Sequence, residues 1–125
     1  MNVLNNLKYS EDHEWVKVEG DIAYIGITDY AQDQLGDVVF VDVNTVGETL
    51  SKGDAFGTIE AVKTVSDVYM PMGGEVLEFN EIIEETPDIL NKDPYEKGWI
   101  IKVKMSDPSE VDMLLDAEAY KAIIA

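Results

Sequence analysis

The chain contains no cysteine among its 125 residues, which excludes disulfides, thiolate metal sites and cysteine nucleophiles. Its only histidine is His13, and one histidine without cysteine cannot make a zinc site of the usual composition. No Gly-x-Ser-x-Gly nucleophile motif is present, and Gly73-Gly74 is not followed by the Lys-Ser/Thr of a phosphate loop. Any sulfur chemistry beyond methionine must therefore come from an attached group.

Positive charge is also scarce, because 9 basic residues face 26 acidic ones and the formal net charge is −17. Nucleic acid and anionic membranes would repel such a surface, so neither is an expected partner, whereas basic patches on other proteins would attract it. The chain has no apolar run of membrane-spanning length, and its first ten residues lack the features of a secretory signal. We therefore expect a cytoplasmic location in a bacterium, or the mitochondrial matrix for a mature eukaryotic form.

Length and hydrophobic content (46%) suit one domain, residues 1–125. Two β-rich runs around Gly20-Asp21 predict an amino-terminal hairpin. Thr28 and Gly36 are suitable ends for a short helix. Ser109 and Asp116 are possible caps for two carboxy-terminal helices. Further strands are predicted at residues 38–43, 55–60, 65–70, 75–79 and 99–105.

A faint internal repeat indicates how these elements are arranged. Three short matches recur in the same order about 40 residues apart: Gly36-Asp37-Val38 with Gly74-Glu75-Val76, Leu50–Asp54 with Leu90–Pro94, and Gly57-Thr58-Ile59 with Gly98-Trp99-Ile100. Two similar β-units that face each other predict a mainly β fold, a small sandwich or hybrid barrel of quasi-symmetric halves.

Lys63 lies midway between the two repeat units, in a segment rich in strand-forming residues. By composition this segment is one long strand, and no Asn-Gly or Asp-Gly marks a turn. If the chain crosses there from one half to the other, a tight turn would project the Lys63 side chain from one end of the domain. The alternative is a plain solvated lysine within a strand.

The segment around Lys63 resembles the lipoyl attachment site of glycine cleavage system H proteins. The resemblance is carried by Glu60-Ala-Val-Lys63-Thr-Val-Ser-Asp67, with Met70-Pro71 and Gly74-Glu75-Val76 after it. Further blocks agree in order along nearly the whole chain: His13–Val16, Gly26–Thr28, Ala31-Gln32, Leu35–Val39 and Asn91–Tyr95 with Gly98-Trp99. Thr64-Val65 departs mildly from the small residues usual in that family.

The resemblance implies a lipoyl/biotinyl-carrier-like fold and a non-catalytic carrier with lipoic acid joined to Lys63. It also implies four kinds of partner: glycine decarboxylase, an aminomethyltransferase, dihydrolipoamide dehydrogenase, and a lipoate ligase or lipoyl transferase. The carrier would take the aminomethyl intermediate of glycine from the first enzyme to the second, a step of one-carbon metabolism, and be reoxidised by the third. Glu14 and Asp67 are the implied carboxylates of a cleft for the loaded arm, with Asp12 and Gln34 standing where relatives have other residues.

Three alternatives remain open from the sequence. One keeps Lys63 and changes the pathway, either to a lipoyl-relay donor or to an H-like carrier in other sulfur chemistry. The second is a small hydrolase or acid–base enzyme that uses a cluster of Glu14, Asp67 and His13. The third is an acidic interaction module without a prosthetic group.

Overall fold

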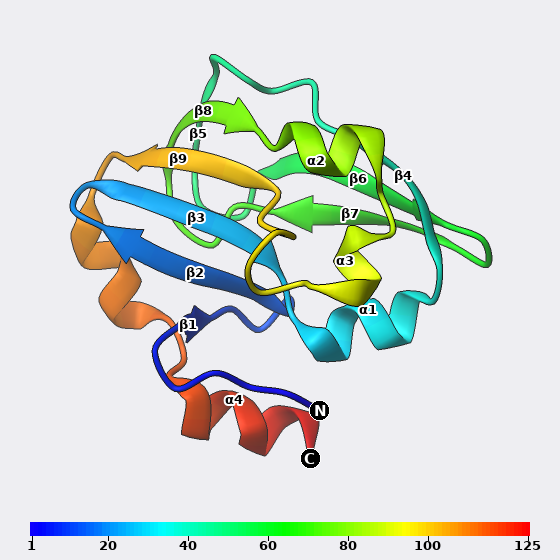
Figure 1. The fold of residues 1–125 in the computed structure, drawn as a ribbon. Coiled ribbons are helices and arrows are strands. Elements are labelled where there is room, and N and C mark those ends of the chain that lie inside the picture. The colour runs from blue at the N-terminus through cyan, green and yellow to red at the C-terminus, as the bar shows by residue number, and fades with distance from the viewer.

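The computed structural model describes all residues, 1–125, and contains two antiparallel sheets that face each other (Figure 1). The larger sheet has the order β1-β2-β3-β9-β8-β5, and the smaller one has the order β4-β6-β7. The strands of the larger sheet are β1 (Lys8–Tyr9), β2 (Glu14–Glu19), β3 (Ile22–Ile27), β9 (Ile101–Met105), β8 (Gly74–Phe79) and β5 (Thr49–Leu50). Those of the smaller sheet are β4 (Val38–Asp42), β6 (Ala55–Ala61) and β7 (Val65–Tyr69).

The internal repeat corresponds to this division. Its first copy supplies the antiparallel pair β4–β6 of the smaller sheet, and its second supplies the pair β8–β9 of the larger sheet. The mainly β, two-unit architecture predicted from the sequence is therefore confirmed. The expected crossing at Lys63 is wrong, because β6 and β7 pair within one sheet, with Glu60 opposite Val65. After β7 the chain passes to the larger sheet at residues 70–73, and it also passes between the sheets before and after the short edge strand β5.

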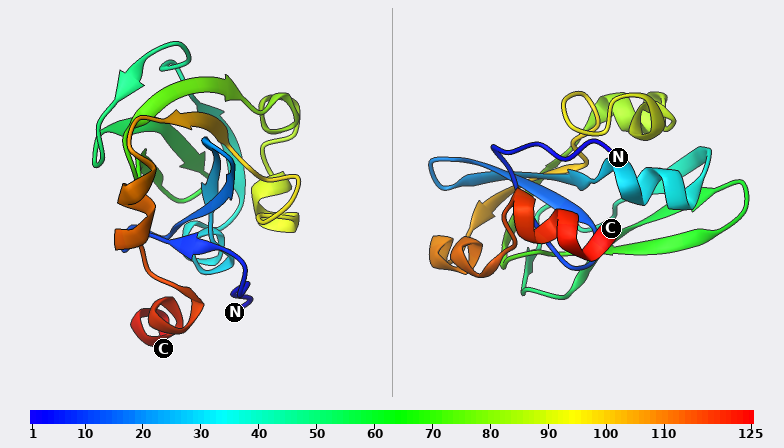
Figure 2. Two further views of the ribbon diagram at one scale, coloured as in Figure 1. Left: turned by 90° about the vertical axis from the view of Figure 1, so that its left-hand side faces the viewer. Right: turned by 90° about the horizontal axis from the view of Figure 1, so that it is seen from below.

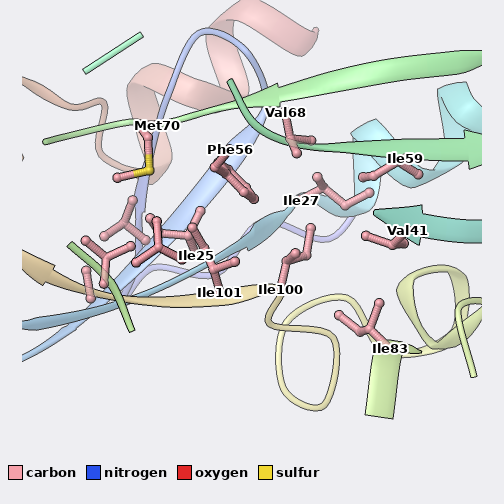
Figure 3. Packing of buried hydrophobic residues seen from close by; sticks show 14 of the residues in the cluster. Ile25, Ile27, Val41, Phe56, Ile59, Val68, Met70, Ile83, Ile100 and Ile101 are labelled. Atoms are coloured by element: carbon pink, nitrogen blue, oxygen red, sulfur yellow. The ribbon is translucent and has the colours of Figure 1, made fainter. Parts of the chain in front are cut away.

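Alternating apolar residues from both sheets fill the space between them (Figure 3). Ile25 and Ile101 of the larger sheet are fully buried, and Phe56, Ile59 and Val68 face them from the smaller sheet. This cluster contains 18 buried residues, so it is the main source of hydrophobic stabilisation.

The helices cover the ends of the sheets. They are α1 (Asp29–Leu35), α2 (Glu81–Glu85), α3 (Ile89–Lys92), the 3-10 helix η1 (Pro108–Met113) and α4 (Ala117–Ile124). Thr28 and Asp116 cap α1 and α4 through their side chains, as predicted. The Ser109 cap is wrong, because Asp107 accepts the N–H of Ser109 and begins the helix two residues earlier. α2 and α3 were not predicted, because both are too short to show a helical period.

A second, smaller cluster attaches the carboxy-terminal segment to the amino-terminal one. The rings of Tyr9 and Tyr120 stack with centroids 4.6 Å apart, and the backbones of Tyr9 and Leu115 exchange two hydrogen bonds. Trp15 lies in the same cluster and is 1% exposed. The chain ends consequently lie side by side, on the opposite side of β2 from the main core (Figures 1 and 2). None of the helices has the length and apolar character needed to cross a membrane.

Candidate functional site

Lys63 lies at the tip of the β6–β7 hairpin, which projects from one end of the molecule (Figures 1 and 2). The turn closes where the N–H of Ala61 donates to the carbonyl of Thr64 at 2.8 Å. The N–H of Val62 donates to the carbonyl of Asp37 at 2.9 Å, which ties the tip to the start of β4. Lys63 itself is exposed and forms no salt bridge. The tight turn and the projecting lysine agree with the sequence prediction.

The lysine stem rests on Gly36, the residue that ends α1. A Cβ at Gly36 would lie 3.1 Å from Cε of Lys63. Gly36 has φ 80° and ψ −158°, a backbone conformation that is essentially restricted to glycine. Asn91 of α3 fixes this corner, since its amide donates to the Gly36 carbonyl and its oxygen accepts the N–H of Val38. The base of the side chain is therefore held on a defined support beside α1.

A cleft of about 290 Å³ opens next to this support, between α1, β7 and the loop before β2. Its apolar wall consists of Ile27, Ala31, Leu35, Ile59 and Val68. Its polar wall consists of Asp12, His13, Tyr30, Gln34, Ser66 and Asp67. Leu35 directly precedes Gly36, so the end of α1 contributes both to the cleft wall and to the support of the lysine stem. An apolar hollow with a few polar groups near its edge is the usual form of a small-molecule site, at the lower end of the usual size range.

Three of the four predicted cleft residues, Asp12, Gln34 and Asp67, line this cleft, and all three are exposed. The hydroxyl of Thr58 donates to Asp67 at 3.2 Å. Glu14 does not line the cleft. The cluster of Glu14, Asp67 and His13 that the hydrolase alternative requires is therefore not assembled around one cavity.

Glu14 instead connects the two sheets from a buried position, with 2% of its surface exposed. One carboxylate oxygen accepts the hydroxyl of Ser10 at 2.6 Å, and the other accepts the backbone N–H of Tyr69 in β7 at 3.1 Å. Burial raises the pKa of Glu14 to about 7, although both hydrogen bonds oppose the rise. The sequence could not show this, because nothing in His-Glu-Trp distinguishes a buried acid from the many exposed ones.

The raised pKa of Glu14 predicts a pH dependence of stability. The unfolded chain loses the Glu14 proton near pH 4.5 and the folded chain near 7, so the folded state binds more protons between these values. The free energy of unfolding should therefore fall as pH rises through this window, by up to about 3 kcal/mol, and be independent of this group above it. Urea unfolding of wild type and Glu14→Gln from pH 4 to 8 should show this fall in wild type only.

The exposed Glu11 of the same loop provides the control. Glu11→Gln should follow the wild-type pH profile. Parallel profiles for wild type and Glu14→Gln would show that the buried carboxyl has an ordinary pKa.

His13 also lines the cleft, and its ring is hydrogen-bonded within the fold. It is the only non-glycine residue with positive φ, at 68°, and its Nδ1 lies 2.9 Å from the hydroxyl of Tyr120 in α4. That partner is 107 residues away in the sequence, so no local pattern could have indicated the contact.

The site thus combines an exposed lysine at a hairpin tip with an apolar, acid-edged cleft beside α1, on a small two-sheet β domain. This combination suits a carrier protein, in which an exposed side chain can bear a prosthetic group. Comparison with known proteins specifies the class further. The family model described as glycine cleavage H-protein matches residues 7–125.

Relatives and structures agree over nearly the full length. The glycine cleavage system H protein of Bacteroides thetaiotaomicron is 64% identical over 124 residues, 99% of this chain and 98% of that protein. The protein of the same name from Bacteroides fragilis is 58% identical over the same shares. The crystal structure of a glycine cleavage system H protein from Mycobacterium marinum superposes with a TM-score of 0.88 at 36% identity, covering 98% of both chains. The chain belongs to the glycine cleavage H-protein family and is a carrier component of the glycine cleavage system, not an enzyme.

Proposed function

We propose that Lys63 is the attachment point of the lipoyl group in this carrier, joined through an amide to Nζ. The observation that carries the proposal is the position of Lys63 at the tip of a tied-down hairpin, exposed and with its stem on Gly36. An amine that is free of ion pairs is open to acylation. The absence of cysteine is consistent with sulfur supplied by an attached group.

The residues beside Lys63 fit a lipoyl arm. The five apolar cleft residues suit its hydrocarbon and disulfide portion, and the acids at the cleft edge suit a cationic group. A lipoyl group held by Lys63 would supply a disulfide, able to be reduced by two electrons and to take the aminomethyl carbon of glycine once the carboxyl group has left as carbon dioxide. The protein's own part is to tether, since a short flexible link raises the local concentration of the reacting group to roughly millimolar at a docked active site.

The same proposal includes the partners and the location. We infer that glycine decarboxylase, an aminomethyltransferase and dihydrolipoamide dehydrogenase each receive the hairpin tip, and that a lipoate ligase or lipoyl transferase acylates Lys63. Exposed acids near the tip, such as Asp37, Glu60 and Asp67, favour partner surfaces that are basic around the active-site entrance. The bacterial relatives favour the cytoplasm over the mitochondrial matrix.

Peptide mapping by mass spectrometry tests the attachment directly. Protein from cells with active lipoate ligase should carry a lipoyl-sized adduct on the peptide that contains Lys63 and on no other lysine. A glycine-dependent loading assay with glycine decarboxylase then separates this function from the lipoyl-relay alternative, because only a glycine cleavage carrier becomes loaded. An adduct on another lysine, or none at all, would refute the proposal.

The two cleft acids yield a further prediction. Asp12→Asn and Asp67→Asn should each shorten the lifetime of the loaded arm about fivefold, since each removes a charge that holds the cationic group, worth roughly 1 kcal/mol at an exposed position. The measurement is the rate of ammonia release from loaded carrier without other enzymes. Asp42→Asn, an exposed acid of β4 outside the cleft, should leave the rate unchanged. An equal effect of all three variants would indicate general surface charge.

A further inference from the structure

His13 has an unusual backbone that the structure maintains from both sides. Its left-handed conformation is unfavourable for a residue with a side chain and is found mostly at functional or tightly determined positions. Its N–H donates to the carbonyl of Ser10 at 3.1 Å, and its carbonyl accepts the N–H of Thr28 at 3.0 Å. These two bonds turn the imidazole toward α1 and α4, where it packs against Tyr30 and Tyr120.

A series of hydrogen-bonded hydroxyl groups, from Tyr120 and Thr28, connects to the His13 ring. Nδ1 of His13 lies 2.9 Å from the hydroxyl of Tyr120, which lies 2.6 Å from Oγ1 of Thr28. Oγ1 of Thr28 also accepts the N–H of Ala31 at 3.2 Å as the cap of α1. Thr28 and Tyr120 are both 0% exposed, so neither hydroxyl can exchange these partners for water.

The number of hydroxyl hydrogens and acceptors indicates which group donates in each of these hydrogen bonds. If Thr28 directs its hydroxyl hydrogen to the oxygen of Tyr120, both buried hydroxyl hydrogens have an acceptor, whereas in the reverse direction the Thr28 hydrogen has none. Tyr120 then directs its own hydrogen to Nδ1 of His13, the only other partner of its hydroxyl. Nδ1 is therefore an acceptor, and the neutral ring carries its hydrogen on Nε2. Nε2 has no hydrogen-bond partner in the protein, and His13 lines the cleft.

The charged form of the ring does not fit this arrangement. An imidazolium would place a hydrogen on Nδ1 against the Tyr120 oxygen, which leaves one buried hydroxyl hydrogen without an acceptor. Burial lowers the pKa of His13, and Asp12 beside it opposes the shift. Burial raises the pKa of Tyr120 to about 12, so its hydroxyl remains a donor. Besides Asp12, the groups around the ring are Tyr30 of α1, Tyr120 of α4 and, across the cleft, Asp67 of β7.

We propose that Thr28, Tyr120 and His13 form a directed hydrogen-bond chain that holds His13 as a neutral Nε2–H donor on the cleft wall. Tyr120 is a positioning residue in this scheme, and α4 thereby contributes to the cleft. A neutral donor at His13 would bind an uncharged or anionic acceptor atom of a ligand. A cationic group of the same ligand would bind to Asp12 and Asp67 instead. This ligand assignment rests on the proposed function, because the sulfur atoms of a lipoyl arm on Lys63 are such acceptors.

Nitrogen-15 NMR of the imidazole tests the chain, and the single histidine makes the assignment unambiguous. Unmodified protein at neutral pH should show the Nε2–H tautomer. Tyr120→Phe should give a mixture of tautomers and raise the His13 pKa by roughly one unit, the equivalent of one lost hydrogen bond. Thr28→Ser should preserve the wild-type pattern. Tyr9→Phe is the matched control, since it removes a hydroxyl from the same ring stack that bonds only to Leu4.

An Nδ1–H tautomer in wild type, or equal shifts in Tyr9→Phe and Tyr120→Phe, would overturn the chain. The arm is tested on the same sample after its intact mass shows the adduct: the Nε2 resonance should move between unmodified and lipoylated protein. An unmoved resonance with the adduct present would overturn the donor role in the cleft. If no adduct forms, the proposed function and the arm as ligand fail together, while the tautomer still decides the role of Tyr120.

Discussion

Lys63→Arg should remove the lipoyl adduct completely and reduce glycine-dependent loading to background. The guanidinium group keeps the positive charge and most of the stem, but it stays protonated at any accessible pH and is no acyl acceptor. The Lys63 side chain is exposed, and the substitution leaves the backbone hydrogen bonds of the hairpin tip intact. The free energy of unfolding should therefore change by less than about 0.5 kcal/mol. The measurements are intact mass, the loading assay and urea unfolding of the same preparation.

Lys52→Arg is the matched control, because Lys52 is also exposed and lies in a turn between strands. It should be lipoylated and loaded like wild type. Retained loading in Lys63→Arg would place the carrier group elsewhere. Loss of loading in both variants would indicate a general requirement for lysine on the surface.

Gly74→Ala should destabilise the fold by about 3 kcal/mol or more, the upper range for forcing atoms into a packed core. Gly74 begins β8, which lies between β9 and the edge strand β5 of the larger sheet, opposite Leu50 on one side and Met105 on the other. A Cβ there would lie 2.4 Å from the carbonyl oxygen of Lys104 and 2.5 Å from Cγ1 of Val103. The first of these atoms belongs to the backbone of the neighbouring strand, so relief requires β8 and β9 to separate.

The adjacent Gly73 provides the comparison. A Cβ at Gly73 would lie 3.3 Å from the Leu50 carbonyl oxygen, a distance that a small shift relieves, and the N–H that Gly73 donates to Glu110 would remain. Gly73→Ala should therefore cost less than about 1 kcal/mol in urea unfolding. Equal losses from the two variants would mean that the strand pair yields more easily than the structure indicates.

Period and capping predicted much of this fold because those signals are local. The β-rich runs at residues 21–27 and 99–105 contain β3 and β9, and Thr28 and Asp116 begin helices as their side chains suggest. The hairpin tip has no such signal, because Val62 and Lys63 both avoid positive φ, and the turn types marked by Asn-Gly depend on it. Only the repeat and the family resemblance indicated a turn there.

The site was predictable to a lesser degree. The resemblance brought Asp12, Gln34 and Asp67 to one cleft from three separate segments, and the structure places all three on its walls. It could not show that Glu14 is buried between the sheets. That burial depends on Tyr69, which is 55 residues away in the sequence and lies in the other sheet, as well as on nearby Ser10. The contact of His13 with Tyr120 is likewise long-range, and it forms only because the carboxy-terminal helix folds back onto the amino-terminal strands.

The tied-down turn at Lys63 determines where motion resides in a loaded carrier. Because Val62 is hydrogen-bonded to Asp37 and the Lys63 stem rests on Gly36, the hairpin backbone itself contributes little motion. An arm on this lysine searches a volume centred on a fixed origin, with a radius set by the arm alone. A partner then has only the torsions of the arm to immobilise on docking, at about 0.5–1.5 kcal/mol for a flexible side chain, and no loop to order. The rigidity of the hairpin would thus keep the entropic cost of docking an arm on Lys63 small.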